Sequence, residues 1–210
     1  MSKILENKCK EELKNLDGVK RILLHSRSAP WTTHLISSLS SYFDITILYY
    51  NPNIAPQDEY LKRKNEQIKL INMLTSPNKI NYIDCDYDND KYNELVKGYE
   101  MCPEKGERCT ICFNLRLEET AKKAKENNYD YFCSTLTVSP YKNAELINEI
   151  GEQLEKKYNV KWLHSDFKKE NGYKHSIELS HKYGLYRQDY CGCVYSKRDE
   201  LLRKSKNNND

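Results

Sequence analysis

The chain has 210 residues, of which 38% are hydrophobic, and its 34 basic and 31 acidic side chains leave a formal net charge of +3. This composition argues against a disordered chain, and so small a net charge does not by itself indicate nucleic-acid binding. No stretch reaches the roughly 18 apolar residues of a membrane helix, and the first residues lack the apolar segment of a signal peptide. We therefore expect one soluble, cytoplasmic domain that is not bound to a membrane.

Short β-branched and aromatic segments alternate with helical patterns along the chain. The predicted strands are residues 21–25, 45–50, 79–83, 129–133 and 160–163. The predicted helices are residues 34–42, 57–74, 90–97, 109–127, 142–158 and 176–183, and a last helix begins at residue 197 and frays into a polar tail ending at residue 210. This alternation predicts an α/β fold with a single Rossmann-like parallel sheet flanked by helices.

The end of the chain differs in composition from the rest, because polar and aromatic loop segments surround one short predicted helix. We expect a single domain over residues 1–210, in which residues 1–165 form the α/β core and residues 166–210 form a small C-terminal lobe of helix and loop over the strand ends. Binding sites in such sheets gather at the carboxyl ends of the strands. Residues 25–31, 51–56 and 134–141 follow three of the predicted strands and are therefore expected near the site.

Among the eight cysteines, Cys109 and Cys112 form a C-x-x-C at the start of a predicted helix. In a reducing compartment, such close pairs indicate metal binding or redox work more often than a disulfide framework. The positive helix end and the neighbouring Arg108 are expected to lower the thiol pKa. Two thiolates are only half of the usual four ligands, so a metal site, a redox dithiol and a structural coincidence all remain open for this pair.

A second close pair, Cys191 and Cys193, flanks Gly192. The conformational freedom of glycine lets so short a loop bend until the two sulfurs meet. A ring this small is strained and readily reduced, which favours a redox-active pair over a structural disulfide. The neighbouring Arg187 and Tyr190 indicate a loop beside a substrate or one that seals a core.

Several segments together carry a resemblance to a known family. They are residues 22–26 (ILLHS) followed by Ala29 and Pro30, 50–54 (YNPNI), the C-x-x-C with 115–120 (LRLEET), 135–140 (TLTVSP), 142–145 (KNAE), 165–169 (SDFKK) and 184–193 (GLYRQDYCGC). Through these segments the chain resembles, nearly end to end, the QueH-type epoxyqueuosine reductases.

The resemblance implies reductive removal of the epoxide oxygen of epoxyqueuosine to give queuosine at the tRNA wobble position. The expected partners are a tRNA carrying epoxyqueuosine in its anticodon loop and an electron donor that the sequence does not identify. Lys142, Asn143, Asp166 and Arg187 are candidate substrate-binding residues, and each has the alternative of an ordinary surface charge or loop hydrogen bonder.

The resemblance also assigns the cysteines. Cys109 and Cys112 correspond to ligands of an iron–sulfur cluster, expected to be a 4Fe-4S cluster with room for a second iron, and Cys191 and Cys193 correspond to a redox-active disulfide. The family takes further cluster ligands from cysteines that follow the first strand.

Those further ligands are replaced in this chain. Arg27 and Ser28 occupy the paired cysteine positions, and Trp31 occupies the next ligand position. Arginine stays protonated, the indole nitrogen has no ligating lone pair and a serine oxygen is a poor substitute for a thiolate. We therefore expect cluster binding to be impaired.

Two alternatives follow from this replacement: a cluster-deficient, non-catalytic homologue that binds tRNA or nucleoside, and a zinc-stabilised protein without redox turnover. His25, His34 and Cys133 are possible substitute ligands. Ser28 and Pro30 still predict a cap and first turn for the following helix, so local structure is expected to persist.

Overall fold

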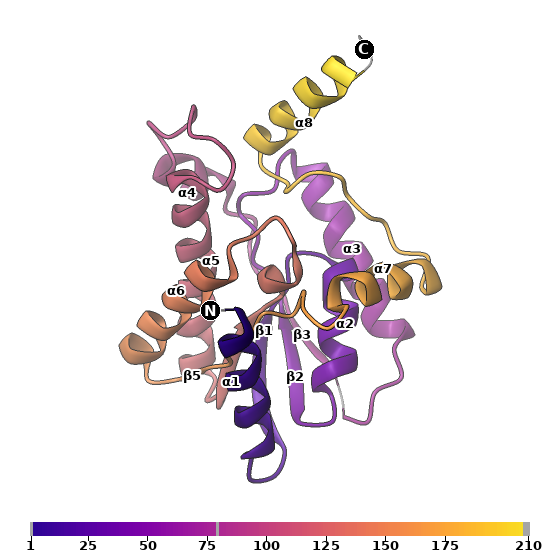
Figure 1. The fold of residues 1–210 in the computed structure, drawn as a ribbon. Coiled ribbons are helices and arrows are strands. Elements are labelled where there is room, and N and C mark those ends of the chain that lie inside the picture. Colours follow the sequence, from indigo (N-terminus) through magenta and orange to yellow (C-terminus); the bar gives the residue numbers. More distant parts are fainter. Residues whose placement is uncertain (1, 79, 208–210) are drawn as a thin grey trace.

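The computed structural model describes residues 2–78 and 80–207, which form a parallel sheet between two layers of helices (Figure 1). The elements in chain order are α1 (Ser2–Lys14), β1 (Lys20–His25), α2 (Ala29–Leu39), β2 (Phe43–Leu48), α3 (Gln57–Met73), β3 (Asn81–Ile83), α4 (Asn89–Leu95), α5 (Glu107–Glu126), β4 (Tyr131–Ser134), the 3-10 helix η1 (Thr135–Val138), α6 (Ala144–Tyr158), β5 (Lys161–Trp162), α7 (Gly172–Lys182) and α8 (Val194–Asn207).

The sheet has the order β3-β2-β1-β4-β5, and every pairing in it is parallel. The chain starts in the centre with β1, adds β2 and β3 on one side, and then returns to place β4 and β5 on the other. Leu24 of β1 lies between Ile47 and Cys133 of its two neighbours. The order of strands therefore reverses between β1 and β4, which is where ligands bind in such folds. The predicted Rossmann-like parallel sheet is confirmed.

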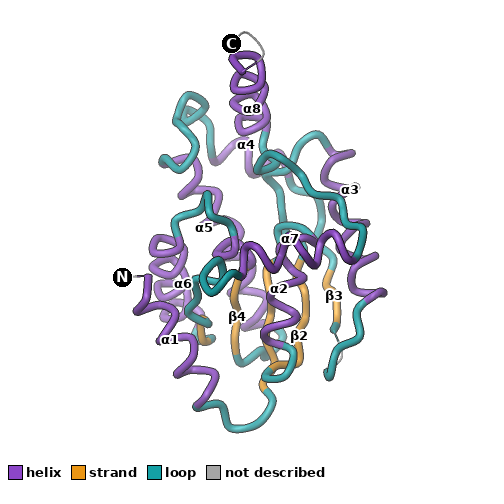
Figure 2. The backbone as a smooth tube through the Cα atoms, turned by 45° about the vertical axis from the view of Figure 1, so that its right-hand side comes forward, coloured by secondary structure: helices purple, strands orange, loops and turns teal. Residues whose placement is uncertain are grey.

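Helices cover both faces of the sheet. On one face α2 packs against α3 and α7, whereas on the other α5 packs against β1, β4 and α6 (Figures 1 and 2). The central strands are buried on both sides, which explains their continuous apolar sequences rather than an alternating pattern. Both layers continue past the carboxyl ends of the strands and supply residues to the site.

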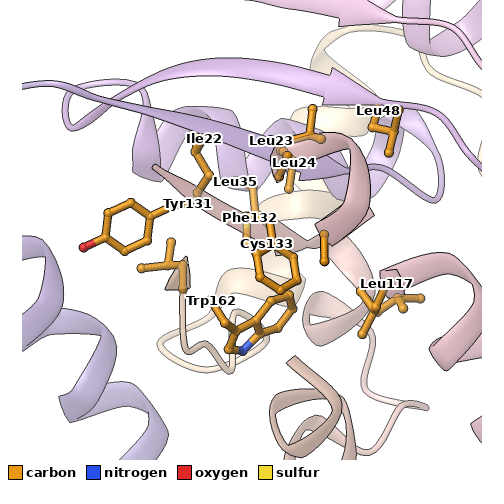
Figure 3. Packing of buried hydrophobic residues seen from close by; sticks show 14 of the residues in the cluster. Ile22, Leu23, Leu24, Leu35, Leu48, Leu117, Tyr131, Phe132, Cys133 and Trp162 are labelled. Atoms are coloured by element: carbon orange, nitrogen blue, oxygen red, sulfur yellow. The ribbon is translucent and has the colours of Figure 1, made fainter. Parts of the chain in front are cut away.

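The core lies along β1 and β4 (Figure 3). Phe132 meets Trp162 edge to face with 5.0 Å between ring centroids, and the indole Nε1 donates a hydrogen bond to Asn148 Oδ1 at 2.9 Å. Gly151 of α6 allows this close approach, because a Cβ there would lie 2.2 Å from the Trp162 ring. The packing fixes α6 and the loop after β4 against the sheet.

The C-terminal segment crosses the carboxyl end of the sheet, as expected from the sequence. Its backbone joins two strand-end loops, since Lys168 N donates to Thr137 O at 3.2 Å and Ala55 N donates to Gly192 O at 3.0 Å. Helix α8 then extends away from the sheet (Figure 1). The division of the domain at residues 165 and 166 remains a prediction.

Some element boundaries differ from the prediction. Helix α1 was not predicted, and α2 begins at Ala29 instead of residue 34, with Ser28 as its N-cap residue and Pro30 in its first turn. Residue 79 of the third predicted strand and residues 208–210 of the predicted tail lie outside the described residues. No helix within the described ranges is both long and apolar enough to cross a membrane.

Candidate active site

The two cysteine pairs meet at the carboxyl end of the sheet. Cys109, Cys112, Cys191 and Cys193 all line one small cavity of about 10 Å³, together with Lys142. These four cysteines are free thiols in the structure. Two segments far apart in the sequence therefore bring four reduced sulfurs to one place.

Helix α5 positions the first pair. The helix begins at Glu107, so that Cys109 and Cys112 lie one turn apart in its first two turns. Lys105 N donates to Cys109 Sγ at 3.3 Å, and Arg116 Nη1 donates to Cys112 Sγ at 3.9 Å. The helix register thus directs both sulfurs to the same side.

The environment of this pair disfavours thiolate. Burial raises the pKa of Cys109 and raises the pKa of Cys112 to about 12. Arg108 does not offset this burial, because its Nη1 donates to the backbone oxygens of Glu100 and Cys102 at 2.9 and 2.5 Å. The expectation that Arg108 and the helix start lower these thiol pKa values is therefore wrong.

A tightly held loop positions the second pair. Arg63 Nη1 donates a hydrogen bond to Cys191 O at 3.0 Å, and Ala55 N donates one to the carbonyl oxygen of the next residue, Gly192. Gly192 has φ +129°, and a Cβ there would lie 2.9 Å from Ile54 Cγ1 and 3.0 Å from Arg63 Nη1. Glycine is thus required both by the backbone conformation and by the close approach.

Cys193 is fixed by the helix that follows it. It directly precedes α8, and its Sγ accepts a hydrogen bond from Ser196 N at 3.4 Å. This is the contact of an N-cap side chain with a free amide of the first helical turn. The sulfur of Cys193 therefore has a defined position beside Cys191.

Cys191 differs electrostatically from the other pair. Burial opposes its ionisation, but the positive charges of Lys142, Arg27 and Arg116 lower the pKa of Cys191 to about 7. Lys142 is itself buried and forms an ion pair with Glu104 at 3.2 Å. A substantial fraction of Cys191 is therefore thiolate at neutral pH.

A larger cavity of about 400 Å³ opens beside Cys191, which is the one member of the two pairs that lines it. Aromatic and cationic side chains form much of its wall. Trp31 stacks on Tyr173 with 5.7 Å between ring centroids and 19° between ring planes, and the Arg27 and Arg187 guanidiniums lie 5.0 and 5.3 Å from the Trp31 ring. Cavities of this size and composition accommodate a planar, polar ligand such as a nucleobase.

The four candidate substrate-binding residues separate into two groups. Lys142 and Arg187 line the larger cavity. Asn143 is exposed, and its Oδ1 caps α6 by accepting from Glu145 N at 3.0 Å and Leu146 N at 3.3 Å. Asp166 is buried next to β5 and forms an ion pair with Lys168 at 2.5 Å. Neither Asn143 nor Asp166 lines that cavity, so substrate contact by these two remains only a prediction from the sequence.

Sequence reasoning missed a buried polar network beneath the thiols. Arg116 is fully buried, and it donates to Asn51 Oδ1 at 2.6 Å and to His25 Nε2 at 3.3 Å. His25 Nδ1 lies 2.8 Å from Ser134 Oγ, and burial together with Arg116 lowers the pKa of His25 well below its ordinary value. The available signal was that Arg116 and Asn51 belong to segments that carry the family resemblance.

The residues at the replaced ligand positions do not fit an iron–sulfur cluster. Arg27 is 5% exposed and brings a cation to the site, and Ser28 Oγ accepts a hydrogen bond from Gln188 Nε2 at 2.8 Å. Trp31 has no ligating lone pair. Cys109 and Cys112 thus lack the further thiolates that the family resemblance places at positions 27, 28 and 31.

The possible substitute ligands do not fill this gap. His25 already uses both ring nitrogens, His34 Nδ1 lies 3.1 Å from His175 Nδ1, and Cys133 is fully buried in the core. Among the residues whose side chains are described, no three or more His, Cys, Asp or Glu are arranged to hold a metal ion. The described side chains therefore give no support to the zinc-stabilised alternative either.

A Rossmann-like sheet with two cysteine pairs at its topological switch point defines an α/β protein with a thiol site at the strand ends. A model of the family described as "Epoxyqueuosine reductase QueH" matches residues 22–199 of this chain. The chain belongs to this family.

Similar proteins support the assignment over most of the chain. A Staphylococcus epidermidis protein is 46% identical over 185 residues, covering 86% of this chain and 78% of the relative. A Streptococcus pyogenes serotype M1 protein is 42% identical, with 84% and 70% covered, and a Thermotoga maritima protein is 35% identical, with 87% and 96% covered. Each of the three is named Epoxyqueuosine reductase QueH.

Proposed function

We propose that this chain reduces epoxyqueuosine to queuosine at the wobble position of a tRNA, with the modified base bound in the cavity beside Cys191. The names of its relatives supply the substrate, and one structural observation carries the proposal. Cys191 combines a pKa lowered to about 7 with a place on the wall of the 400 Å³ cavity. A thiolate at a cavity wall is suited to deliver reducing equivalents to a bound ligand.

The two thiols of the second pair satisfy the electron balance of this reaction. Converting the epoxide to an alkene breaks two C–O bonds and releases the oxygen as water, which takes up two electrons and two protons. Oxidation of Cys191 and Cys193 to a disulfide forms one S–S bond and releases two electrons and two protons. The sum is epoxide plus dithiol giving alkene, disulfide and water, and an external electron donor must then reduce the disulfide.

Lys142 is placed to assist at the oxygen. Its ammonium is buried, and the residue lines the larger cavity. Burial and the charge of Arg27 oppose its ionisation, but Cys191, Glu104 and Cys109 together raise its pKa. A charged donor near the epoxide stabilises negative charge developing on oxygen and supplies a proton. We assign this role to Lys142.

The proposed macromolecular partner is a tRNA carrying epoxyqueuosine in its anticodon loop, where an unpaired base can enter the cavity. The aromatic stack of Trp31 and Tyr173 offers a face for that base. A tRNA substrate also agrees with the cytoplasmic location predicted from the sequence, which we retain as part of the proposal.

The test is conversion of a synthetic anticodon stem-loop that contains epoxyqueuosine. Fully reduced protein is mixed anaerobically with this RNA and a dithiol reductant, and queuosine is measured by mass spectrometry of the digested RNA. We expect queuosine from the unaltered chain and only background from the Cys191→Ser, Cys193→Ser double variant. Equal background from both proteins would overturn the proposed reaction.

A second function, binding without catalysis, is favoured by one observation. Arg27 occupies the first position at which the family resemblance places a cluster ligand, and its side chain is buried in the site. A non-catalytic homologue would bind the same stem-loop with an affinity that falls steeply with added salt, but would produce no queuosine. Binding measured beside the conversion assay separates the two functions.

A further inference from the structure

Arg27 is a buried cation that faces the Cys191 thiol but has no carboxylate partner in the described part of the chain. It is 5% exposed, and no carboxylate in the described part of the chain forms a salt bridge with it. Its Nε is fully buried and makes no hydrogen bond with a described residue. Burial lowers the pKa of Arg27 to about 10, because Cys191 and Glu104 compensate its charge only in part. Buried guanidinium donors are seldom left unused, so this residue points to a ligand.

The carboxylates of the cavity do not neutralise Arg27. Each carboxylate there already has a cationic partner: Glu104 pairs with Lys142, Asp189 with Lys204, and Glu200 with Arg203. Arg187 resembles Arg27 in forming no salt bridge with a described residue, and its Nη1 donates to Ser180 Oγ at 2.9 Å. Two guanidiniums beside Trp31 are therefore available to an anion.

Two neutral donors lie on the same wall without a partner. Trp31 and Ser139 both line the cavity, and the Nε1 of Trp31 and the hydroxyl of Ser139 are buried and make no hydrogen bond with described residues. Together with Arg27 Nε they are three donors from two strand-end segments, residues 25–31 and 134–141. A ligand with several acceptor oxygens and a negative charge would satisfy all of them.

We propose that Arg27, Trp31 and Ser139 form a binding site for a phosphate group, either free or within a ribonucleotide chain. The corner that the family resemblance assigns to a metal cluster would thus bind an oxyanion in this chain. The cavity of about 400 Å³ is larger than a single phosphate and leaves room for an attached nucleoside. The phosphate site itself does not depend on the proposed function. Only the RNA, as one of the two sources of the phosphate, rests on that function.

The test measures binding of inorganic phosphate to the full chain by isothermal titration calorimetry. We expect binding that is weakened about ten-fold or more in Arg27→Gln and retained in part in Arg27→Lys, since lysine keeps the charge but loses the fork of donors. Trp31→Phe removes only the indole donor and is expected to weaken binding several-fold. Arg198→Gln, on α8 outside this cavity, is the matched control and should bind like the unaltered chain.

Far-UV circular dichroism and thermal unfolding establish that each variant is folded, and Trp31→Phe keeps the aromatic packing if Arg27→Gln does not fold. No phosphate binding, or binding that neither Arg27→Gln nor Trp31→Phe weakens, would overturn the site. Competition between phosphate and the anticodon stem-loop would identify an RNA phosphate as the occupant, whereas simultaneous binding would identify free phosphate. Arg27-dependent phosphate binding in a chain that makes no queuosine would support this site while refuting the proposed reaction.

Discussion

The two cysteine pairs share a cavity but have different chemical environments. Cys109 and Cys112 lie in the first turns of α5, where burial raises the pKa of both thiols. Cys191 lies in a loop before α8, where surrounding cations lower its pKa to about 7, and it also reaches the larger cavity. The second pair is thus the one suited to react with a ligand.

This contrast shows that distant residues decide the reactivity of each thiol. Arg108 is next to Cys109 in sequence but binds backbone carbonyls. Lys142 and Arg27, from two strand-end loops, act on Cys191 instead. Sequence neighbours of a cysteine are therefore a poor guide to its pKa when the fold brings other charges closer.

The largest expected effect is on iron and sulfide binding. It tests whether Cys109 and Cys112 lack only the cysteines that the family resemblance places at positions 27, 28 and 31. Restoring Arg27→Cys, Ser28→Cys and Trp31→Cys together should raise bound iron and sulfide from background to about four of each per chain. The reason is that three added thiols complete the donor set around Cys109 and Cys112. Iron and sulfide are measured after anaerobic reconstitution.

The matched control is the restored chain with Cys109→Ser and Cys112→Ser added, which should return to background. Equal iron and sulfide uptake by the unaltered and restored chains would contradict our conclusion that the present residues do not fit a cluster.

A second test compares one cysteine from each pair. Cys191→Ser should lower the rate of queuosine formation by a factor on the order of 100 or more, because the reacting thiol is lost. Cys109→Ser should lower it less than about five-fold, since this thiol lines only the small cavity. Rates are measured under single-turnover conditions, and similar losses in both variants would remove the distinction between the pairs.

A third test compares the glycine beside each pair. Gly192→Ala should lower the free energy of unfolding by about 1–3 kcal/mol, because φ is +129° and the new Cβ would crowd Ile54 and Arg63. Gly106→Ala, at the start of α5, has an ordinary φ of −79° and a contact of 3.1 Å to Pro103 O, so we expect less than about 1 kcal/mol.

Urea denaturation measures both glycine variants. Equal losses of unfolding free energy in Gly192→Ala and Gly106→Ala would show that the loop carrying Cys191 and Cys193 is less tightly held than its contacts indicate.

The smallest expected effect is a shift in pH dependence. Thiolate is the reactive form, so alkylation of Cys191 by iodoacetamide should rise through a midpoint near pH 7 as the proton is lost, whereas Cys109 should react only at higher pH. Lys142→Gln removes a charge that favours the thiolate and should raise the Cys191 midpoint by about one pH unit. Mass spectrometry resolves the two sites. A common midpoint for Cys191 and Cys109 would contradict the electrostatic contrast.

The sheet was predictable from the sequence because its strands are apolar runs separated by helical periods. Helix α1 was missed because it packs through a narrow face, with Cys9 its one buried residue among those whose side chains are described. The N-cap position of Ser28 was predicted, but its side chain accepts from Gln188 instead of capping α2. That contact comes from a distant segment, which local patterns do not reveal.

Within the site, both cysteine pairs were predictable as close spacings, but their meeting in one cavity requires the fold. Lys142 and Arg187 were identified through the family resemblance, whereas Arg116 was not, because a buried arginine in a helical pattern looks like a surface charge. Its role depends on Asn51 and His25, which follow or end other strands. Long-range polar networks of this kind are the part that a single sequence leaves open.

The most direct measurement of the central claim is the location of the disulfide after one turnover. Reduced protein is given one equivalent of epoxyqueuosine stem-loop without added reductant, quenched with an alkylating agent, and mapped by mass spectrometry. The account predicts one Cys191–Cys193 disulfide for each queuosine formed, with Cys109 and Cys112 alkylated as thiols. Queuosine formed while Cys191 and Cys193 remain thiols would contradict it.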